Sequence, residues 1–202
     1  GIILKDLGKL EEAELSTRKA IQLKPDYEKA HLNLGIILKD LGKLEEAELS
    51  TRKAIQLNPN FADAHCTLGL IFKALGKLEE AELSIRKAIE INPNFAMAYC
   101  NLGGILKDLG KLEKAELSIR KAIELNSNLS KAYYSLSVIK YNDQNKIWQD
   151  QLFSENILNN KLTKEKIDLY FARANILHKE SNFKESAKYL QLANNLKQNL
   201  NP

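Results

Sequence analysis

The sequence predicts an all-α protein, a superhelical α-solenoid of helix-turn-helix hairpins. The string GIILKDLGKLEEAELSTRKAIQL fills residues 1–23 and returns unchanged at residues 35–57, a step of 34 residues, and weaker copies begin at Gly69 and Gly103. Within each step, apolar residues recur every three or four positions, stop at a glycine and then resume, which is the spacing of two amphipathic helices. A period of this length indicates a repeat protein in which each unit packs on its neighbours.

The first helix of each hairpin is predicted from apolar residues that share one face, which in the copy at 28–61 are Ala30, Leu34, Ile37, Leu38 and Leu41. Gly42, Gly76 and Gly110 follow this helix in successive copies. Because a residue with positive φ commonly ends a helix and glycine adopts that conformation without strain, we expect these glycines to form the turn.

The second helix begins after the turn and is predicted to end before Pro59 or Pro93, because proline cannot continue a helix. Glutamate precedes arginine by four residues along it, at Glu48 and Arg52 and at the equivalent positions of the next copies. These pairs are expected to support the helix by a few tenths of a kcal/mol each.

Residues at seven spaced positions then carry a family resemblance, and they are His31, Leu34, Gly35, Leu38, Ala47, Thr51 and Pro59 in one copy and His65, Leu68, Gly69, Phe72, Ala81, Ile85 and Pro93 in the next. This spacing resembles that of the tetratricopeptide repeat (TPR), with the first aromatic reduced to His or Tyr. The resemblance implies that the solenoid is right-handed and that ligands lie on its concave face. His31 and His65 are interpreted as packing residues.

The repeats divide the chain into a regular array at 1–129 and divergent TPR-like helices at 130–202. The array comprises a partial repeat at 1–27 and full repeats at 28–61, 62–95 and 96–129. A degenerate hairpin at 130–163 follows, in which Lys140 replaces an apolar residue, Gln144 replaces the turn glycine and one helix is expected over 144–159. A last hairpin is expected at 167–200, with its turn at Asn182 and Phe183. This divergent end is predicted to cap the array.

Composition excludes several classes of function. No segment approaches the roughly 18 consecutive apolar residues of a membrane helix, so no membrane contact is expected. The net charge of +4 arises late in the chain, since residues 1–129 hold 19 basic and 19 acidic residues and residues 130–202 hold 11 and 7. There is no basic stripe with stacking aromatics, and nucleic-acid binding is therefore not expected.

The two cysteines, Cys66 and Cys100, stand one repeat apart without a C-x-x-C pair, so neither a zinc site nor a disulfide framework is indicated. A reducing, cytoplasmic location is expected. No nucleotide-binding, nucleophile-elbow or H-E-x-x-H motif occurs, so we expect no catalytic residue, metal or cofactor in this chain. Gly1 opens within a repeat and Met97 is the only methionine, so the chain is expected to be part of a longer protein.

The candidate binding residues are those of each first helix that do not build the predicted core, namely Leu32, Asn33, Ile36, Lys39, Cys66, Thr67, Leu70, Lys73, Cys100, Asn101, Gly104 and Lys107. Stacked repeats bring like positions together, which predicts an apolar floor flanked by a row of lysines. Asp40 and Asp108 follow two of these lysines and are expected to reduce the charge of the row. An extended peptide of a protein partner is the expected ligand.

The segment AHLNLGIILKDLGKLEEA at 30–47 is similar to repeats of the O-linked N-acetylglucosamine transferases. That resemblance implies that Asn33 and Asn101 belong to an asparagine ladder that holds a peptide backbone, interrupted here by Thr67 and Ser135. A role in bonding neighbouring helices is the alternative for both asparagines. The paired Lys and Asn of TPR carboxylate clamps are absent, because apolar residues stand in their place, so a chaperone adaptor is disfavoured.

Residues 140–160 and 168–197 resemble the segment that joins TPR arrays to sulfotransferase domains in bacterial TPR–sulfotransferase proteins. This resemblance implies an alternative function, in which the chain recruits substrates for a catalytic domain that lies outside it. Self-association through near-identical repeat faces is a third hypothesis.

Overall fold

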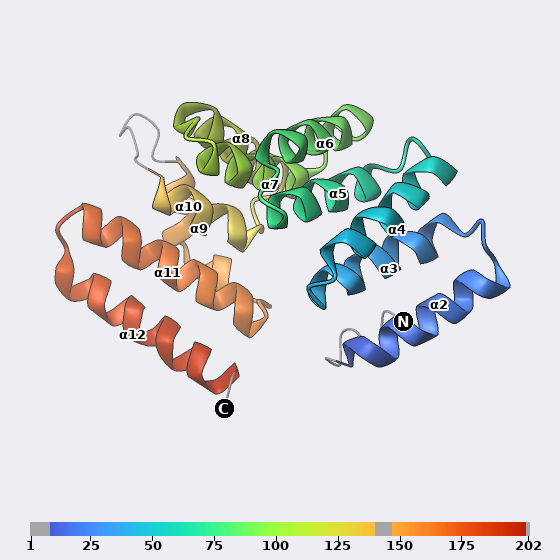
Figure 1. The fold of residues 1–202 in the computed structure, drawn as a ribbon. Coiled ribbons are helices and arrows are strands. Elements are labelled where there is room, and N and C mark those ends of the chain that lie inside the picture. Colours follow the sequence, from blue (N-terminus) through green and yellow to red (C-terminus); the bar gives the residue numbers. More distant parts are fainter. Residues whose placement is uncertain (1–8, 140–146, 201–202) are drawn as a thin grey trace. The chain divides into compact units, whose positions relative to one another are not determined.

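A computed structural model describes residues 9–139 and 147–200 of the chain. Over these ranges the backbone forms helices and turns and contains no strand (Figure 1). Consecutive helices pack as hairpins, and neighbouring hairpins pack on each other. The predicted all-α class and solenoid architecture are therefore confirmed. The chain divides into two compact units, residues 1–98 and residues 99–202.

The first unit is built from hairpins that follow the 34-residue period. Its helices are α2 (Leu10–Leu23), α3 (Glu28–Asp40), α4 (Leu44–Leu57), α5 (Ala62–Ala74), α6 (Leu78–Ile91) and the start of α7 (Ala96–Asp108). Helix α3 packs on α4 and α5 packs on α6, while α4 joins the two hairpins by packing on α5. The second helices α4 and α6 end two residues before Pro59 and Pro93, as predicted.

Glycine is needed at two kinds of position in each hairpin. Gly42, Gly76 and Gly110 have φ of 77°, 76° and 74°, which confirms the predicted left-handed turn. Gly35 instead lies in the middle of α3, where an added Cβ would stand 2.2 Å from Oγ1 of Thr51 on α4. The absence of a side chain at Gly35 thus lets the two helices of the hairpin approach closely.

The histidines at the first TPR position, His31 on α3 and His65 on α5, each form a hydrogen bond to the turn before their helix. Nε2 of His31 lies 2.8 Å from the carbonyl oxygen of Pro25, and Nε2 of His65 lies 2.9 Å from that of Pro59. A carbonyl only accepts, so Nε2 of each ring is the donor in this bond. Tyr133 makes the equivalent bond from its hydroxyl to the carbonyl of Ser127, at 2.9 Å. These residues are structural, as the sequence predicts.

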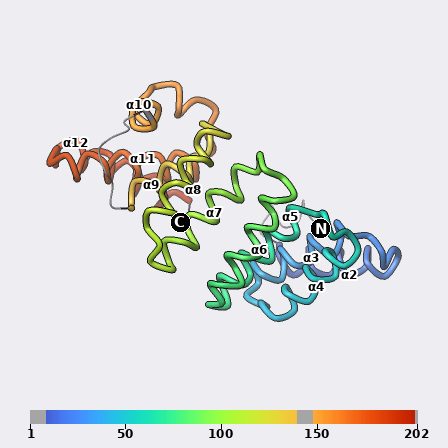
Figure 2. Tube along the Cα trace, turned by 90° about the horizontal axis from the view of Figure 1, so that it is seen from above, coloured from blue at the N-terminus to red at the C-terminus, as the bar shows by residue number. Residues whose placement is uncertain are grey.

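The second unit departs from the regular pattern after its first hairpin. It contains most of α7, then α8 (Leu112–Leu125), α9 (Ser130–Val138), α10 (Ile147–Phe153), the 3-10 turn η1 (Glu155–Leu158), α11 (Thr163–Lys179) and α12 (Phe183–Leu200). Helices α9, α10 and α12 all pack against α11, which is the centre of this unit (Figure 2). Residues 180–182 connect α11 to α12, and Ser181 there has φ of 61°. The repeat boundaries proposed from the sequence remain predictions.

The single helix expected over 144–159 is wrong, because the backbone is extended at Ser154 between α10 and η1. The buried side chain of Arg173 on α11 binds the backbone at this break. Its Nε donates to the carbonyl of Leu152 and its second terminal nitrogen donates to that of Ser154, both at 2.9 Å. These bonds give donors to carbonyls at the end of α10, where the helical pattern of backbone bonds stops. The expectations for Lys140 and Gln144 lie outside the described residues.

Candidate peptide-binding site

The first helices of the hairpins in the first unit leave one narrow side accessible, which we call the first-helix face. On α3 it contains Asn33, Ile36 and Lys39, and on α5 it contains Leu70 and Lys73, all of them partly exposed. Ile37, Leu38, Ile71 and Phe72, on the other sides of these helices, are at most 5% exposed. Five of the predicted binding residues therefore present both polar groups and apolar surface to the outside.

Three other predicted residues of this unit form the layer beneath that face. Leu32, Cys66 and Thr67 are only 6%, 5% and 8% exposed. Leu32 packs with Ala54 and Ala64 between neighbouring hairpins. These residues support the face and offer it little surface of their own.

In the second unit, α7 continues the pattern with Cys100 and Asn101 buried and with Gly104 and Lys107 accessible. Lys131, in the first turn of α9, donates from Nζ to Oδ1 of Asn101 at 3.1 Å. The asparagine is therefore bonded to the next repeat, which agrees with the structural role that the sequence left open for it. The bond also brings a cation to this side of α7.

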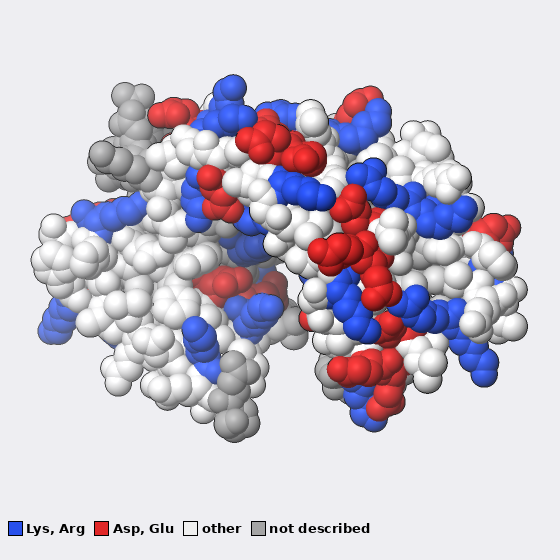
Figure 3. Space-filling model, viewed as in Figure 1, with Lys and Arg blue, Asp and Glu red and all other residues white. Residues whose placement is uncertain are grey.

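The row of lysines is partly neutralised, as the aspartates next to it predict. Nζ of Lys39 lies 2.6 Å from Oδ1 of Asp40, and both side chains are about one quarter exposed, at 27% and 29%. An ion pair this accessible contributes little to stability but lowers the positive potential at the surface. On the face of the first unit that Figure 3 shows, acidic and basic side chains are mixed rather than separated.

Sequence reasoning missed a group of residues on the first helices α9 and α11, namely Lys131, Tyr134, Lys164, Asp168 and Phe171. Tyr134 stands 34 residues after Cys100, so continuing the period by one repeat would have found it. With Lys197 and Leu200 of α12 and with Ile167, all but Lys131 line a hollow of about 500 Å³, here named the C-terminal hollow. It lies wholly within the second unit.

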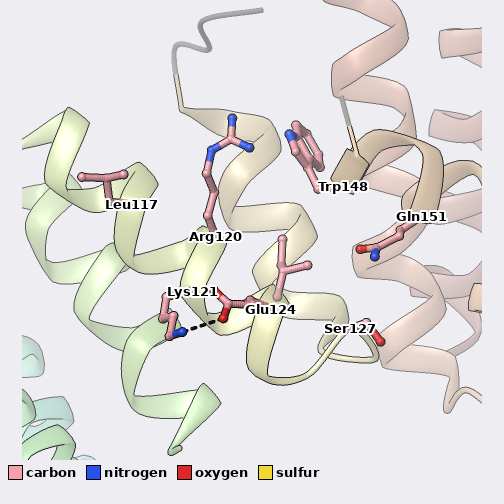
Figure 4. Close-up of a pocket in the computed structure, with 8 residues that line it drawn as sticks. Leu117, Arg120, Lys121, Glu124, Ser127, Trp148 and Gln151 are labelled. Carbon is pink, nitrogen blue, oxygen red and sulfur yellow. Dashed lines mark hydrogen bonds and ion pairs between the residues drawn. The ribbon is translucent and has the colours of Figure 1, made fainter. Parts of the chain in front are cut away.

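A different hollow, of about 670 Å³, lies between the second helix α8 and the short helix α10 (Figure 4). Arg120, Lys121 and Glu124 line it from α8, and Trp148 and Gln151 line it from α10. Nζ of Lys121 and Oε1 of Glu124 pair at 2.6 Å along one edge. None of the predicted binding residues lines this hollow.

The described residues contain no cluster of three or more His, Cys, Asp or Glu side chains that could hold a metal ion. Cys66 and Cys100 are free and buried. Within the same described ranges, no helix is both long enough and apolar enough to cross a membrane.

Models of the tetratricopeptide repeat match residues 28–61, 62–95 and 85–116, and a further TPR repeat model matches residues 1–42. These matches together span residues 1–116, more than half of the 202-residue chain. The chain therefore belongs to the tetratricopeptide repeat family. A comparison with curated proteins found no match.

Solved structures with the same fold include the APC/C hetero-tetramer Cut9–Hcn1, with a TM-score of 0.78 at 17% identity over 97% of this chain and 38% of that chain. A thermophilic TPR protein of Thermus thermophilus has a TM-score of 0.67 at 19% identity, covering 94% of this chain and 95% of its own. The first TPR of Spaghetti (RPAP3), bound to an HSP90 peptide, has a TM-score of 0.52 at 24% identity over 54% and 86%. At these identities the likeness shows the fold alone.

Proposed function

We propose that this chain is a non-catalytic scaffold that binds an extended peptide of a protein partner in the concave groove formed by the first helices of its TPR hairpins. One observation carries the proposal. The first-helix face keeps Asn33, Ile36 and Leu70 partly accessible although most other positions of α3 and α5 are buried. Stacked repeats bring like positions of these first helices together, so the accessible amide and apolar groups form one surface on which an extended ligand can lie.

The chemistry of this face suits a peptide backbone. A side-chain amide offers two donors and an acceptor, so Asn33 can pair with the carbonyl and the N–H of one peptide unit whatever its side chain. Ile36 and Leu70 add apolar contact area beside the amide. Together these groups favour binding of main chain with limited sequence preference, and the charges around them set the remaining selectivity.

A relative supports the general mode of binding. The first TPR of Spaghetti is described in complex with the HSP90 peptide SRMEEVD, an acidic ligand. We extend to this chain only the use of the fold for binding a peptide, because the sequence disfavours a carboxylate clamp here. The two proteins share the fold at 24% identity. The residues that we assign to the groove are taken from the repeat positions of this chain and not from that structure.

The experiment is selection of linear peptides by phage display against the whole chain, followed by measurement of their affinity for a triple variant, Asn33→Ala, Lys39→Ala and Lys73→Ala. A matched control is Gln56→Ala, Lys53→Ala and Lys87→Ala, which removes one amide and two lysines from the exposed side of α4 and α6. The proposal predicts at least about tenfold weaker binding, or about 1.4 kcal/mol, for the first variant and little change for the control. Equal binding by both variants, or no selected peptide, would overturn it.

The finer expectations from the sequence stay predictions. A sulfotransferase domain in the parent protein is tested by the gene sequence past Pro202, and self-association is tested by light scattering at several concentrations. The cytoplasmic location is tested by imaging the tagged protein in its own cell.

A further inference from the structure

The C-terminal hollow has an aromatic floor that the regular repeats lack. Tyr134 of α9 is 38% exposed, and its ring centroid lies 6.4 Å from that of Phe171 on α11, with the rings tilted at 57°. At the position of Tyr134 the earlier repeats carry Leu32, Cys66 and Cys100, all of them buried. The divergent hairpins thus place two aromatic rings where the array has only a supporting layer. Exposed aromatic side chains are the residues that most often anchor a bound partner.

A longer last helix forms one wall of the hollow. Helix α12 has 18 residues, whereas the second helices α4 and α6 have 14. Its last turns bring Lys197 and Leu200 to the hollow beside the start of α11, and Leu200 is 47% exposed. Helices α11 and α12 pack along each other through the rest of the hairpin (Figure 1). The wall therefore belongs to a well-packed hairpin.

The edge of the hollow is positively charged. Lys164 and Lys197 line it and are exposed, and Asp168 is the one acidic residue among the described side chains that line it. Lys131 lies nearby and interacts electrostatically with Asp168, while its Nζ is bonded to Asn101 on α7. Three lysines thus surround Asp168 and the nearby Glu165, and the net charge of the chain arises in this same part of the sequence, after residue 129.

Asp168 itself lies in a partly desolvated place. Burial, and to a smaller extent the nearby charge of Glu165, raises the pKa of its carboxyl group above the usual value, while the charges of Lys164 and Lys131 act in the opposite direction.

From this arrangement we infer that the C-terminal hollow binds an acidic peptide segment by a large apolar side chain, with the ring or aliphatic group on Tyr134 and Phe171 and the flanking carboxylates near Lys131, Lys164 and Lys197. The inference deepens the proposed function, on which it rests, because it names the chemistry of the partner. Through Lys131 and Asn101, the hollow continues the side of α7 that carries a residue of the predicted asparagine ladder.

The test uses the whole chain and a fluorescein-labelled peptide of about ten residues, in which one central phenylalanine is flanked by glutamates. Binding is followed by fluorescence anisotropy against a probe with lysines in place of the glutamates and a probe with alanine in place of the phenylalanine. The protein variants are Lys164→Glu with Lys197→Glu for the edge, and Tyr134→Ser for the floor. Lys184→Glu with Lys188→Glu is the matched control, since it makes the same charge change on exposed positions of α12.

The inference predicts binding of the acidic aromatic probe only, at least about tenfold weaker with the edge variant and with the floor variant, and nearly unchanged with the control. Circular dichroism verifies that each variant is folded. Equal binding of the basic probe, equal loss in the control, or a dimer that the edge variant abolishes would overturn it. If display-selected peptides bind while the acidic probe does not, this inference fails and the proposed function stands; if neither binds, both fail.

Discussion

Lys131 and Asn101 join two neighbouring repeats through a 3.1 Å hydrogen bond, in which the ammonium group on α9 donates to the side-chain oxygen on α7. The asparagine is 5% exposed, while the lysine is exposed. Asn101, one residue of the predicted asparagine ladder, is thus fixed both by burial and by a hydrogen bond from a cation. A cation at this point favours an anionic ligand along the second unit.

The first prediction concerns that cation. Lys131→Met introduces the residue that stands one repeat earlier, at Met97, and removes the charge while keeping an unbranched side chain. We expect the acidic probe to bind a few-fold more weakly, and its affinity to depend less on salt, because one screened attraction is lost. Anisotropy titrations at low and high ionic strength measure both effects. An unchanged affinity and salt dependence would show that Lys131 has only a structural role.

The second prediction concerns the close approach of α3 and α4. In Gly35→Ala the new Cβ would lie 2.2 Å from Oγ1 of Thr51 and 3.2 Å from the carbonyl oxygen of Ala47, so unfolding free energy should fall by about 1–3 kcal/mol. Urea unfolding measures this loss.

Adding Thr51→Ala to Gly35→Ala should recover part of that stability. The second change removes the nearest atom, a buried hydroxyl with no hydrogen-bond partner among the described residues, and leaves the carbonyl contact. A double variant no more stable than Gly35→Ala would show that the hydroxyl is not the obstacle.

The third prediction concerns Arg173, which stands at the TPR position held by Leu34 and Leu136 in other repeats and is 5% exposed. Its guanidinium holds the carbonyls of Leu152 and Ser154 and lies 5.7 Å from the ring centroid of Phe153. Arg173→Leu restores the repeat pattern but leaves these carbonyls without their donor.

We expect Arg173→Leu to cost about 2–4 kcal/mol of unfolding free energy, with faster hydrogen exchange in α10. Arg173→Lys should lose less, because it keeps a charge and one donor but not the two-pronged geometry. A Leu variant as stable as the parent would mean that the repeat pattern, rather than the arginine, determines this packing.

The fourth prediction concerns the pH dependence of the first unit. Glu14 on α2 lies 2.8 Å from Nζ of Lys43 and 2.8 Å from Nε of Arg18. Hydrogen bonds from Lys43 and, next, from Arg18 hold the pKa of Glu14 below its ordinary value of 4.5. A carboxylate with a lowered folded-state pKa stabilises the fold above its unfolded pKa and loses that contribution as pH falls through the folded value.

Glu14→Gln should therefore destabilise the chain by about 0.5 kcal/mol at neutral pH and have no effect once the parent's carboxyl is protonated in strongly acidic solution. Urea unfolding across that pH range gives the comparison. Glu11→Gln, an exposed change on the same helix, is the control. A loss that stays constant with pH would show that the carboxylate charge is not responsible.

Much of this fold was predictable because the residues that end each helix recur at fixed positions of the repeat. Gly42 and Pro59 mark where helices end, and the turn φ of 77° at Gly42 follows from the residue type. Which first-helix residues remain accessible was predictable only in part. Helical spacing places Leu32 beside Asn33, but burial of Leu32 depends on its contact with Ala54 and Ala64 of other helices.

The divergent end was harder to predict, for a physical reason. The backbone is extended at Ser154, and the carbonyl of this residue accepts a long-range hydrogen bond from Arg173, which lies 19 residues later in the chain. The spacing of apolar residues over 144–159 could not predict this contact, because Arg173 lies outside that segment. Tyr134 and Phe171 were not predicted as site residues for another reason. The hollow that they line also needs the last turns of α12, and the repeat period does not give the length of that helix.

The central claim is that the first helices of the hairpins bind a peptide through their accessible groups, among which is the side-chain amide of Asn33. It is tested most directly by the side-chain amide signals of the ¹⁵N-labelled chain during titration with a display-selected peptide. The account predicts that the signal of Asn33 shifts, while those of Asn58 and Asn92, whose side chains accept bonds from their own turns, do not. Saturable binding that leaves Asn33 unshifted, or that shifts the turn asparagines instead, would contradict it.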